Sequence, residues 1–171
     1  MLLTNYDIPD ILNSYKTPLI FIGMKNRLPA VVKDGNYIIN LESEPSVGSH
    51  WLALVIRQNQ AFYCDSFGGP PPLEVVAFVK TRKGAHLAYS DVIQQHIKSS
   101  NCGYYSCAFL IFMERNSKKY CSLYNTGLKY LSNYHDDSRE NDDILKHLFA
   151  SFSSDCPPLI KRLNNERIRY D

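Results

Sequence analysis

Three side chains whose chemistry can combine in one reaction lie in short polar motifs of this sequence. His50 lies in the segment 48–51, Asp65 in the segment 64–68 and Cys102 in the segment 99–103. An imidazole can act as a general base, a carboxylate can orient it and stabilise its charged form, and a cysteine thiolate is a strong nucleophile. Together these residue types indicate nucleophilic catalysis by a cysteine.

The spacing of His50 and Asp65 places them side by side. Two apolar runs, 51–57 and 60–65, are separated only by Gln58 and Asn59, which predicts a tight antiparallel hairpin. Paired residues in this hairpin have numbers that sum to 117, so Asp65 faces Leu52 and His50 lies one same-face step further along. Because side chains alternate along a strand, His50 and Asp65 are expected on the same face.

Cys102 stands where a small polar loop meets a long apolar run, 102–115. The run has no breaker and is apolar nearly all round, which predicts a central buried helix. The positive end of a helix dipole stabilises a thiolate at the N-terminus, and Gly103 is expected to leave space for a substrate backbone. The alternative is that Asn101 or Ser100 caps the helix and Cys102 only packs in the core.

The motifs in chain order resemble those of the adenain-like cysteine proteases, which include the adenovirus maturation protease and its relatives in polintons and virophages. The SUMO-deconjugating proteases are more distant members of the same superfamily. The resemblance rests on His50-Trp51, the segment 65–68, Gln95 and Cys102-Gly103. Similar segments also lie upstream, at 19–23, 28–32 and 37–42, so the resemblance covers roughly residues 5–115.

The resemblance implies a role for each matching residue. His50 is the general base, Asp65 orients it and Cys102 is the nucleophile. Gln95, seven residues before Cys102 as in adenain, would bind the oxyanion together with the backbone N–H of Cys102. Gln94 remains an alternative for this role.

The substrate cleft is expected to involve two further residues of the same motifs. Trp51 is expected to line the cleft, the alternative being an ordinary core aromatic residue. Gly103 is expected to contact the substrate.

The implied function is a viral maturation protease that cleaves capsid precursors at small or Gly-containing sites. The alternatives are a deconjugating protease acting on ubiquitin-like tails and an inactive binding protein with a protease fold. We expect a monomer without a cofactor, located inside the host cell, in its cytoplasm or virus factory, and in the virion.

Two activators known for adenain are less well supported here. The chain between Gly68 and Gln95 has no cysteine to bond an activating peptide, so peptide activation is not indicated. DNA activation stays open because the basic segments 80–83 and 118–119 could bind phosphates, although short charge runs are usually solvated surface.

The whole composition limits the remaining classes of function. The chain has 171 residues, 44% of them apolar, which fits one domain, and a net charge of +2 argues against a dedicated nucleic-acid or membrane-surface protein. No apolar run reaches the ~20 residues of a membrane span, and the first residues do not resemble a signal peptide.

The five cysteines form no CxxC pair, so we expect free thiols and no metal, with all but Cys102 packed in the core. The polar segment 135–137 is expected to be a loop, although its one His and two Asp could suggest a metal.

The elements that must hold the site are those of an α+β fold. We expect a single domain over 1–171 with a central mixed or antiparallel sheet, flanking helices and a buried helix that begins at Cys102, as in the adenain-like fold. Gly84 is expected to end the helix over 73–83, Asn141 to cap the last helix, and residues 160–171 to form a frayed tail. The expected helices are 7–15, 73–83, 102–115, 120–132 and 142–152, and the expected strands are 18–24, 36–41, 51–57, 60–65, 86–89 and 92–95.

Overall fold

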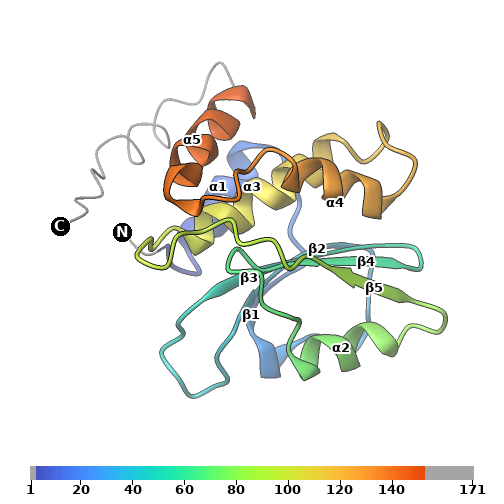
Figure 1. Cartoon of the computed structure of the whole chain (residues 1–171). Helices are drawn as coiled ribbons and strands as arrows, with labels where there is room; N and C mark the ends of the chain where they lie inside the picture. The colour runs from blue at the N-terminus through green and yellow to red at the C-terminus, as the bar shows by residue number, and fades with distance from the viewer. Residues whose placement is uncertain (1–2, 153–171) are drawn as a thin grey trace.

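A five-stranded mixed sheet lies at the centre of the computed structural model, which describes residues 3–152 (Figure 1). The strand order follows the sequence, and the central pairs are antiparallel whereas the two outer pairs are parallel. The α+β class is therefore confirmed, and the sheet is mixed. Its strands are β1 (Phe21–Met24), β2 (Gly35–Asn40), β3 (Trp51–Arg57), β4 (Gln60–Cys64) and β5 (His86–Tyr89).

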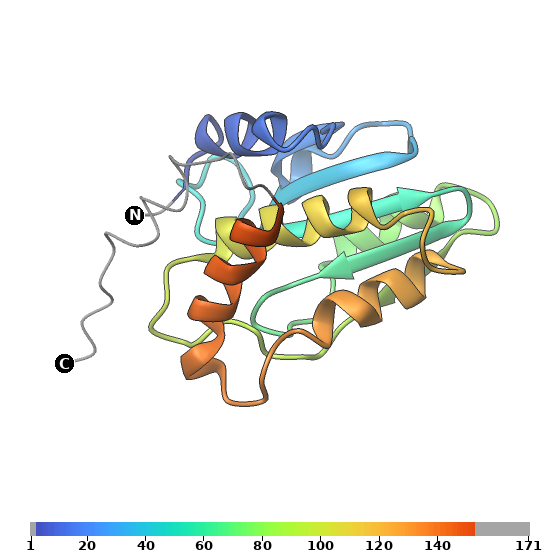
Figure 2. The same ribbon diagram turned by 90° about the horizontal axis from the view of Figure 1, so that it is seen from above.

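Helices cover both faces of this sheet. α2 (Leu73–Lys80) lies on one face, and the other four helices lie on the opposite face (Figures 1 and 2). α3, the expected buried helix, contacts β3 as well as the three helices around it. These four helices are α1 (Asp7–Ser14), α3 (Cys102–Arg115), α4 (Leu123–Leu131) and α5 (Asn141–Phe152), and the 3-10 turns are η1 (Lys25–Arg27) and η2 (Ser138–Glu140).

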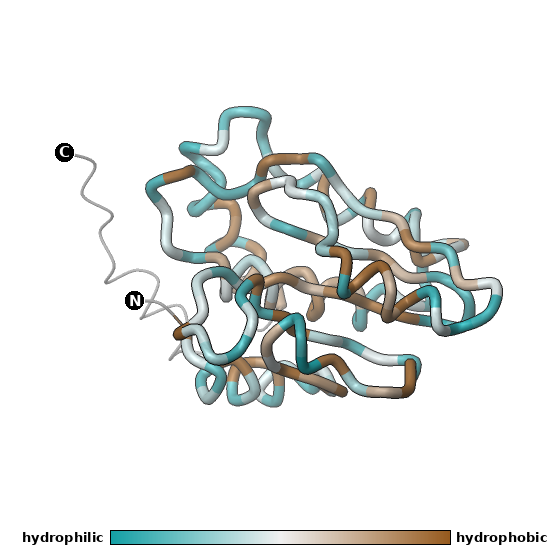
Figure 3. Tube along the Cα trace, turned by 90° about the horizontal axis from the view of Figure 1, so that it is seen from below, coloured by the Kyte–Doolittle hydropathy of each residue, from teal (hydrophilic) through white to brown (hydrophobic). Residues whose placement is uncertain are grey.

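Two hydrophobic cores fill the spaces between the sheet and its helices. Alternate residues of β3 point to opposite sides, so Ala53 and Val55 pack under α3, whereas Leu52, Leu54 and Ile56 pack toward α2. In Figure 3 the loops at the rim are largely hydrophilic, and hydrophobic segments gather toward the middle. Burial on both faces explains why β3 is a continuous apolar run. It also makes β3 a rigid base for the residue that precedes it, His50.

The structure corrects several expected boundaries. Residues 92–95 do not form a strand, because the backbone N–H groups of Gln94 and Gln95 donate to Ser66 O and not to a neighbouring strand. α2 ends at Lys80, before the expected stop at Gly84. Asn141 is the first residue of α5, and its side chain bonds other loops in place of capping the helix. The expected tail, 160–171, lies outside the described residues.

Within residues 3–152, every helix is too short or too polar to cross a lipid bilayer.

Candidate active site

His50 and Asp65 meet at the end of the β3–β4 hairpin. The register pairs Ala53 with Cys64 and Arg57 with Gln60, which is the pairing that the two-residue turn predicted. His50 Nε2 lies 2.7 Å from Asp65 Oδ1, and both residues are 7% exposed. The predicted spatial pairing of these two side chains is therefore confirmed.

Phe67 and Gly69 hold this pair in place. Asp65 Oδ1 also accepts a hydrogen bond of 2.8 Å from the Phe67 N–H. The Phe67 ring packs on the imidazole of His50, with 4.8 Å between ring centroids and an interplanar angle of 31°. A Cβ at Gly69 would lie 2.6 Å from Asp65 Oδ2, so only glycine leaves room for the carboxylate. Phe67 is visible in the sequence only as a motif residue, and its packing on His50 was not predicted.

The environment of His50 favours its charged form. Burial by itself lowers the pKa of an imidazole, but hydrogen bonding to Asp65 and Cys102 and the negative charges of both side chains raise the pKa of His50 to about 9. Cys102 is thus within hydrogen-bonding reach of the imidazole. Since Nε2 is bonded to Asp65, Nδ1 is the ring nitrogen that can face the thiol.

Cys102 is the first residue of α3 and is 4% exposed. Asn101 stands at the N-cap, but its side chain makes no capping hydrogen bond, contrary to the capping alternative. The first N–H groups of a helix have no partner within it, so Cys102 combines a thiol near His50 with a backbone donor at the positive end of α3. This arrangement suits a nucleophile and an oxyanion donor in one residue.

The other described cysteines lack these features. Burial raises the pKa of the Cys64 thiol to about 12 and also strongly raises the pKa of the Cys107 thiol, so both are held as neutral thiols in the core. Cys121 is exposed, so its expected core position is wrong. Cys156 lies outside the described residues.

Gln94 and Gln95 are both buried, but their amides have different partners. Gln94 Nε2 donates to Cys64 Sγ at 3.3 Å, in the core below α3. Gln95 Oε1 accepts from the Ser66 hydroxyl at 2.7 Å, and its Nε2 donates to Ser99 O at 2.6 Å. An amide nitrogen carries two hydrogens, so Gln95 keeps one donor for a further acceptor.

A groove of about 530 Å³ is lined by Trp51 and by Gly48 and Ser49, the residues directly before His50, although His50 and Cys102 are not among its lining residues. The half-buried Trp51 lines this groove and also packs against the core, and its Nε1 donates to Leu3 O at 2.8 Å. A Cβ at Gly103 would lie 2.9 Å from Leu3 Cβ, so Leu3 occupies the space that we expected Gly103 to leave for a substrate. The groove is lined by Leu3, Thr4, Asn5, Ile22, Gly23, Met24, Asn40, Glu44, Val47, Gly48, Ser49 and Trp51.

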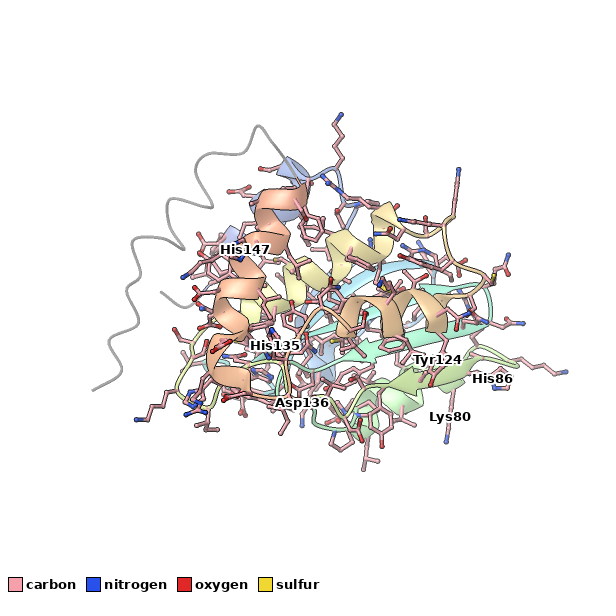
Figure 4. All side chains as sticks on the ribbon, turned by 45° about the horizontal axis from the view of Figure 1, so that its top comes forward. Lys80, His86, Tyr124, His135, Asp136 and His147 are labelled. Atoms are coloured by element: carbon pink, nitrogen blue, oxygen red, sulfur yellow. The ribbon has the colours of Figure 1, made fainter. Side chains whose placement is uncertain are left out.

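Among residues 3–152, no three His, Cys, Asp or Glu side chains gather in a way that could hold a metal ion. His135 and Asp136 lie in the turn before α5, and His147 lies further along that helix (Figure 4). Asp137 points instead to Arg139, with which it forms an ion pair.

The fold is that of the adenain-like cysteine proteases, as the motifs indicated. The chain is similar to the crystal structure of the ASFV pS273R protease, with a TM-score of 0.51 and 17% sequence identity over 84% of this chain and 64% of that chain. In sequence it is 33% identical over 86 residues to the "Putative thiol protease R355" of Acanthamoeba polyphaga mimivirus, which covers 44% of this chain and 28% of that protein. The chain thus spans less than two thirds of either protein. No protein-family model matches it.

Proposed function

We propose that this chain is a cysteine endopeptidase in which Cys102, His50 and Asp65 form the catalytic triad. The observation that carries the proposal is the buried imidazole of His50, bonded to Asp65 on one side and within reach of the Cys102 thiol on the other. A charged imidazole beside a thiol at a helix N-terminus is the arrangement that stabilises a thiolate.

In the first half-reaction, the Cys102 thiolate attacks a peptide carbonyl carbon and a C–S bond forms. The carbonyl oxygen becomes an oxyanion, which accepts hydrogen bonds from the Cys102 backbone N–H and from Gln95 Nε2. The C–N bond then breaks, and the leaving amine takes its proton from the charged His50. In the second half-reaction, neutral His50 accepts a proton from water, which hydrolyses the thioester and restores the thiolate.

The oxyanion role belongs to Gln95 and not to Gln94 in this proposal. The support is that Gln95 is held at both ends of its amide by Ser66 and Ser99 and keeps one N–H for the oxyanion. Gln94 directs its amide into the core, toward Cys64.

The substrate chain lies in the groove that Trp51 and Leu3 border. Leu3 lines this groove and also packs against Gly103, directly after the nucleophile, which supports a preference for small residues such as glycine at the cleavage site. Protein substrates with such sites, and viral capsid precursors in particular, are the proposed targets. The mimivirus and ASFV likenesses support a viral setting.

The test is incubation of the purified chain with the capsid proteins encoded beside it. Wild-type protein should cleave them, and Cys102→Ala should not. Cys121→Ala is the matched control, because it removes an exposed thiol away from the triad and should leave cleavage unchanged. Equal cleavage by wild type and Cys102→Ala would refute the proposal.

A further inference from the structure

The loop that carries Gln95 to the nucleophile has no regular secondary structure between β5 and α3, over residues 90–101. Ser66 holds one side of it. The Ser66 carbonyl accepts hydrogen bonds of 2.8 Å from the N–H groups of both Gln94 and Gln95, and its hydroxyl bonds Gln95 Oε1. These contacts fix where the Gln95 segment begins, but not the Ser99 end that leads into Cys102.

Asn141, at the start of α5, holds the loop from a second side. Its Nδ2 donates to Gln94 O at 2.9 Å and to His135 O at 2.9 Å, and its Oδ1 accepts from the His135 N–H at 2.9 Å. Asn141 is fully buried. It therefore ties the loop to the turn that precedes α5, where Figure 4 labels His135.

Asp142, the next residue, reaches the Ser99 end. Its Oδ1 accepts hydrogen bonds from the Tyr105 hydroxyl at 2.8 Å and from the Ser99 hydroxyl at 3.2 Å. The Ser99 hydroxyl in turn accepts from the Asn101 N–H at 3.3 Å, and Ser99 O accepts the Gln95 amide at 2.6 Å. Ser99 thus links Asp142 to the amide of Gln95 and to Asn101, the residue before Cys102.

This carboxylate is costly to keep where it is. Asp142 is 5% exposed, and its Oδ2 has no hydrogen-bond partner among the described residues. Burying a carboxylate costs free energy, which the two hydrogen bonds to Oδ1 and the positive end of α5 offset. Its contacts are directed at the two segments that meet at the nucleophile, the loop and the first turn of α3.

We infer that Asp142, assisted by Asn141, is a positioning residue that sets the Gln95 amide where the oxyanion forms. The inference rests on the proposed function. A misplacement of about 1 Å in a catalytic group lowers rates by about 100-fold, so an anchor at Ser99 controls the rate without contacting the substrate. α5 therefore belongs to the machinery of the site, although it lies outside the segment, roughly residues 5–115, whose sequence motifs resemble the adenain-like proteases.

The test separates oxyanion binding from thiol reactivity. Asp142→Ala should lower kcat for a cleavable peptide by about 10- to 100-fold and change KM by less than about threefold. Alkylation of Cys102 by iodoacetamide should stay within about twofold of wild type, because the thiolate displaces iodide without forming an oxyanion. Asp142→Asn, which keeps one acceptor oxygen, should restore most of kcat.

Two further variants keep the test decisive. Asp143→Asn is the matched control: it removes a neighbouring acid of the same helix turn, but Asp143 is exposed and pairs with Lys146, so kcat should not change. If Asp142→Ala does not fold, Ser99→Ala removes the same contact from the loop side, and it should lower kcat with alkylation unchanged.

Three results would overturn the inference. Full kcat in folded Asp142→Ala or in Ser99→Ala overturns this inference and leaves the proposed function standing. A parallel loss of alkylation and kcat overturns it as well, because the defect then lies in the Cys102–His50 pair. A wild-type chain that cleaves no peptide overturns the proposed function and this inference together.

Discussion

Replacing Asp65 by asparagine tests the electrostatic basis of the site. The asparagine side chain would keep the volume and one acceptor oxygen for the His50 and Phe67 N–H groups, but it would remove the negative charge. Without this charge, the pKa of His50 should fall from about 9 toward its ordinary value of 6.5, since burial also lowers it. At pH 7.5 a group with a pKa of about 9 is almost fully protonated, whereas one with a pKa of 6.5 is about one tenth protonated. We therefore expect kcat/KM at pH 7.5 to fall at least about tenfold.

The pH profile gives the decisive measurement. The leaving amine needs a protonated His50, so activity should decline as pH rises through about 9 in the wild type and through a value nearer 6.5 in Asp65→Asn. Stability should follow the same sign. A raised pKa stabilises the folded state fully below pH 6.5, and this contribution is lost as pH rises toward about 9.

The control for this variant is Asp91→Asn, which removes an exposed acid from the neighbouring loop and should shift neither profile. If the alkaline decline of folded Asp65→Asn stays near pH 9, Asp65 does not hold the proton on His50 and the reasoning fails.

Four other substitutions test separate parts of the structure. Gln95→Ala should lower kcat by about 100-fold or more, whereas Gln94→Ala should mainly lower the thermal midpoint of unfolding. Both variants are compared by peptide-cleavage kinetics, and a larger loss of kcat in Gln94→Ala would reverse the assignment. Trp51→Phe loses the hydrogen bond to Leu3, about 1 kcal/mol, and should raise KM more than it lowers kcat. Gly127→Ala would place a Cβ 2.5 Å from the Phe62 ring and should destabilise the fold by about 1–3 kcal/mol in urea unfolding, and an unchanged midpoint would contradict this packing.

Local patterns were sufficient for the parts of the site that one hairpin and one helix position. The two-residue turn sets the register that brings His50 to Asp65, and the apolar run from Cys102 predicts α3, because both depend on neighbours in sequence. The strand expected at 92–95 does not form, because the Ser66 carbonyl accepts from the Gln94 and Gln95 N–H groups and Asn141 Nδ2 donates to the Gln94 carbonyl, which uses the backbone groups that a strand would need.

The contacts that could not be predicted join segments far apart in the chain. Leu3 meets Trp51 across 48 positions, and Asp142 meets Ser99 across 43. Neither contact is marked by a periodic pattern or a motif in the sequence, because each depends on how helices pack against the sheet and not on local spacing. Asp142 in particular lies in the first turn of α5. Carboxylates are common at this position because the helix dipole by itself stabilises them, so the residue type does not point to a contact with Ser99.

The charges at the centre of the site explain why so many neutral donors surround it. In the proposed resting state, one buried imidazolium lies between the carboxylate of Asp65 and the thiolate of Cys102, which leaves a net negative charge on buried side chains. Buried charge is tolerated only where hydrogen bonds and dipoles offset it. The Phe67 N–H on Asp65 and the N-terminus of α3 at Cys102 supply this compensation. The same donors at α3 can then stabilise the oxyanion when negative charge moves from sulfur to substrate, so the resting enzyme already has the electrostatics that the transition state needs.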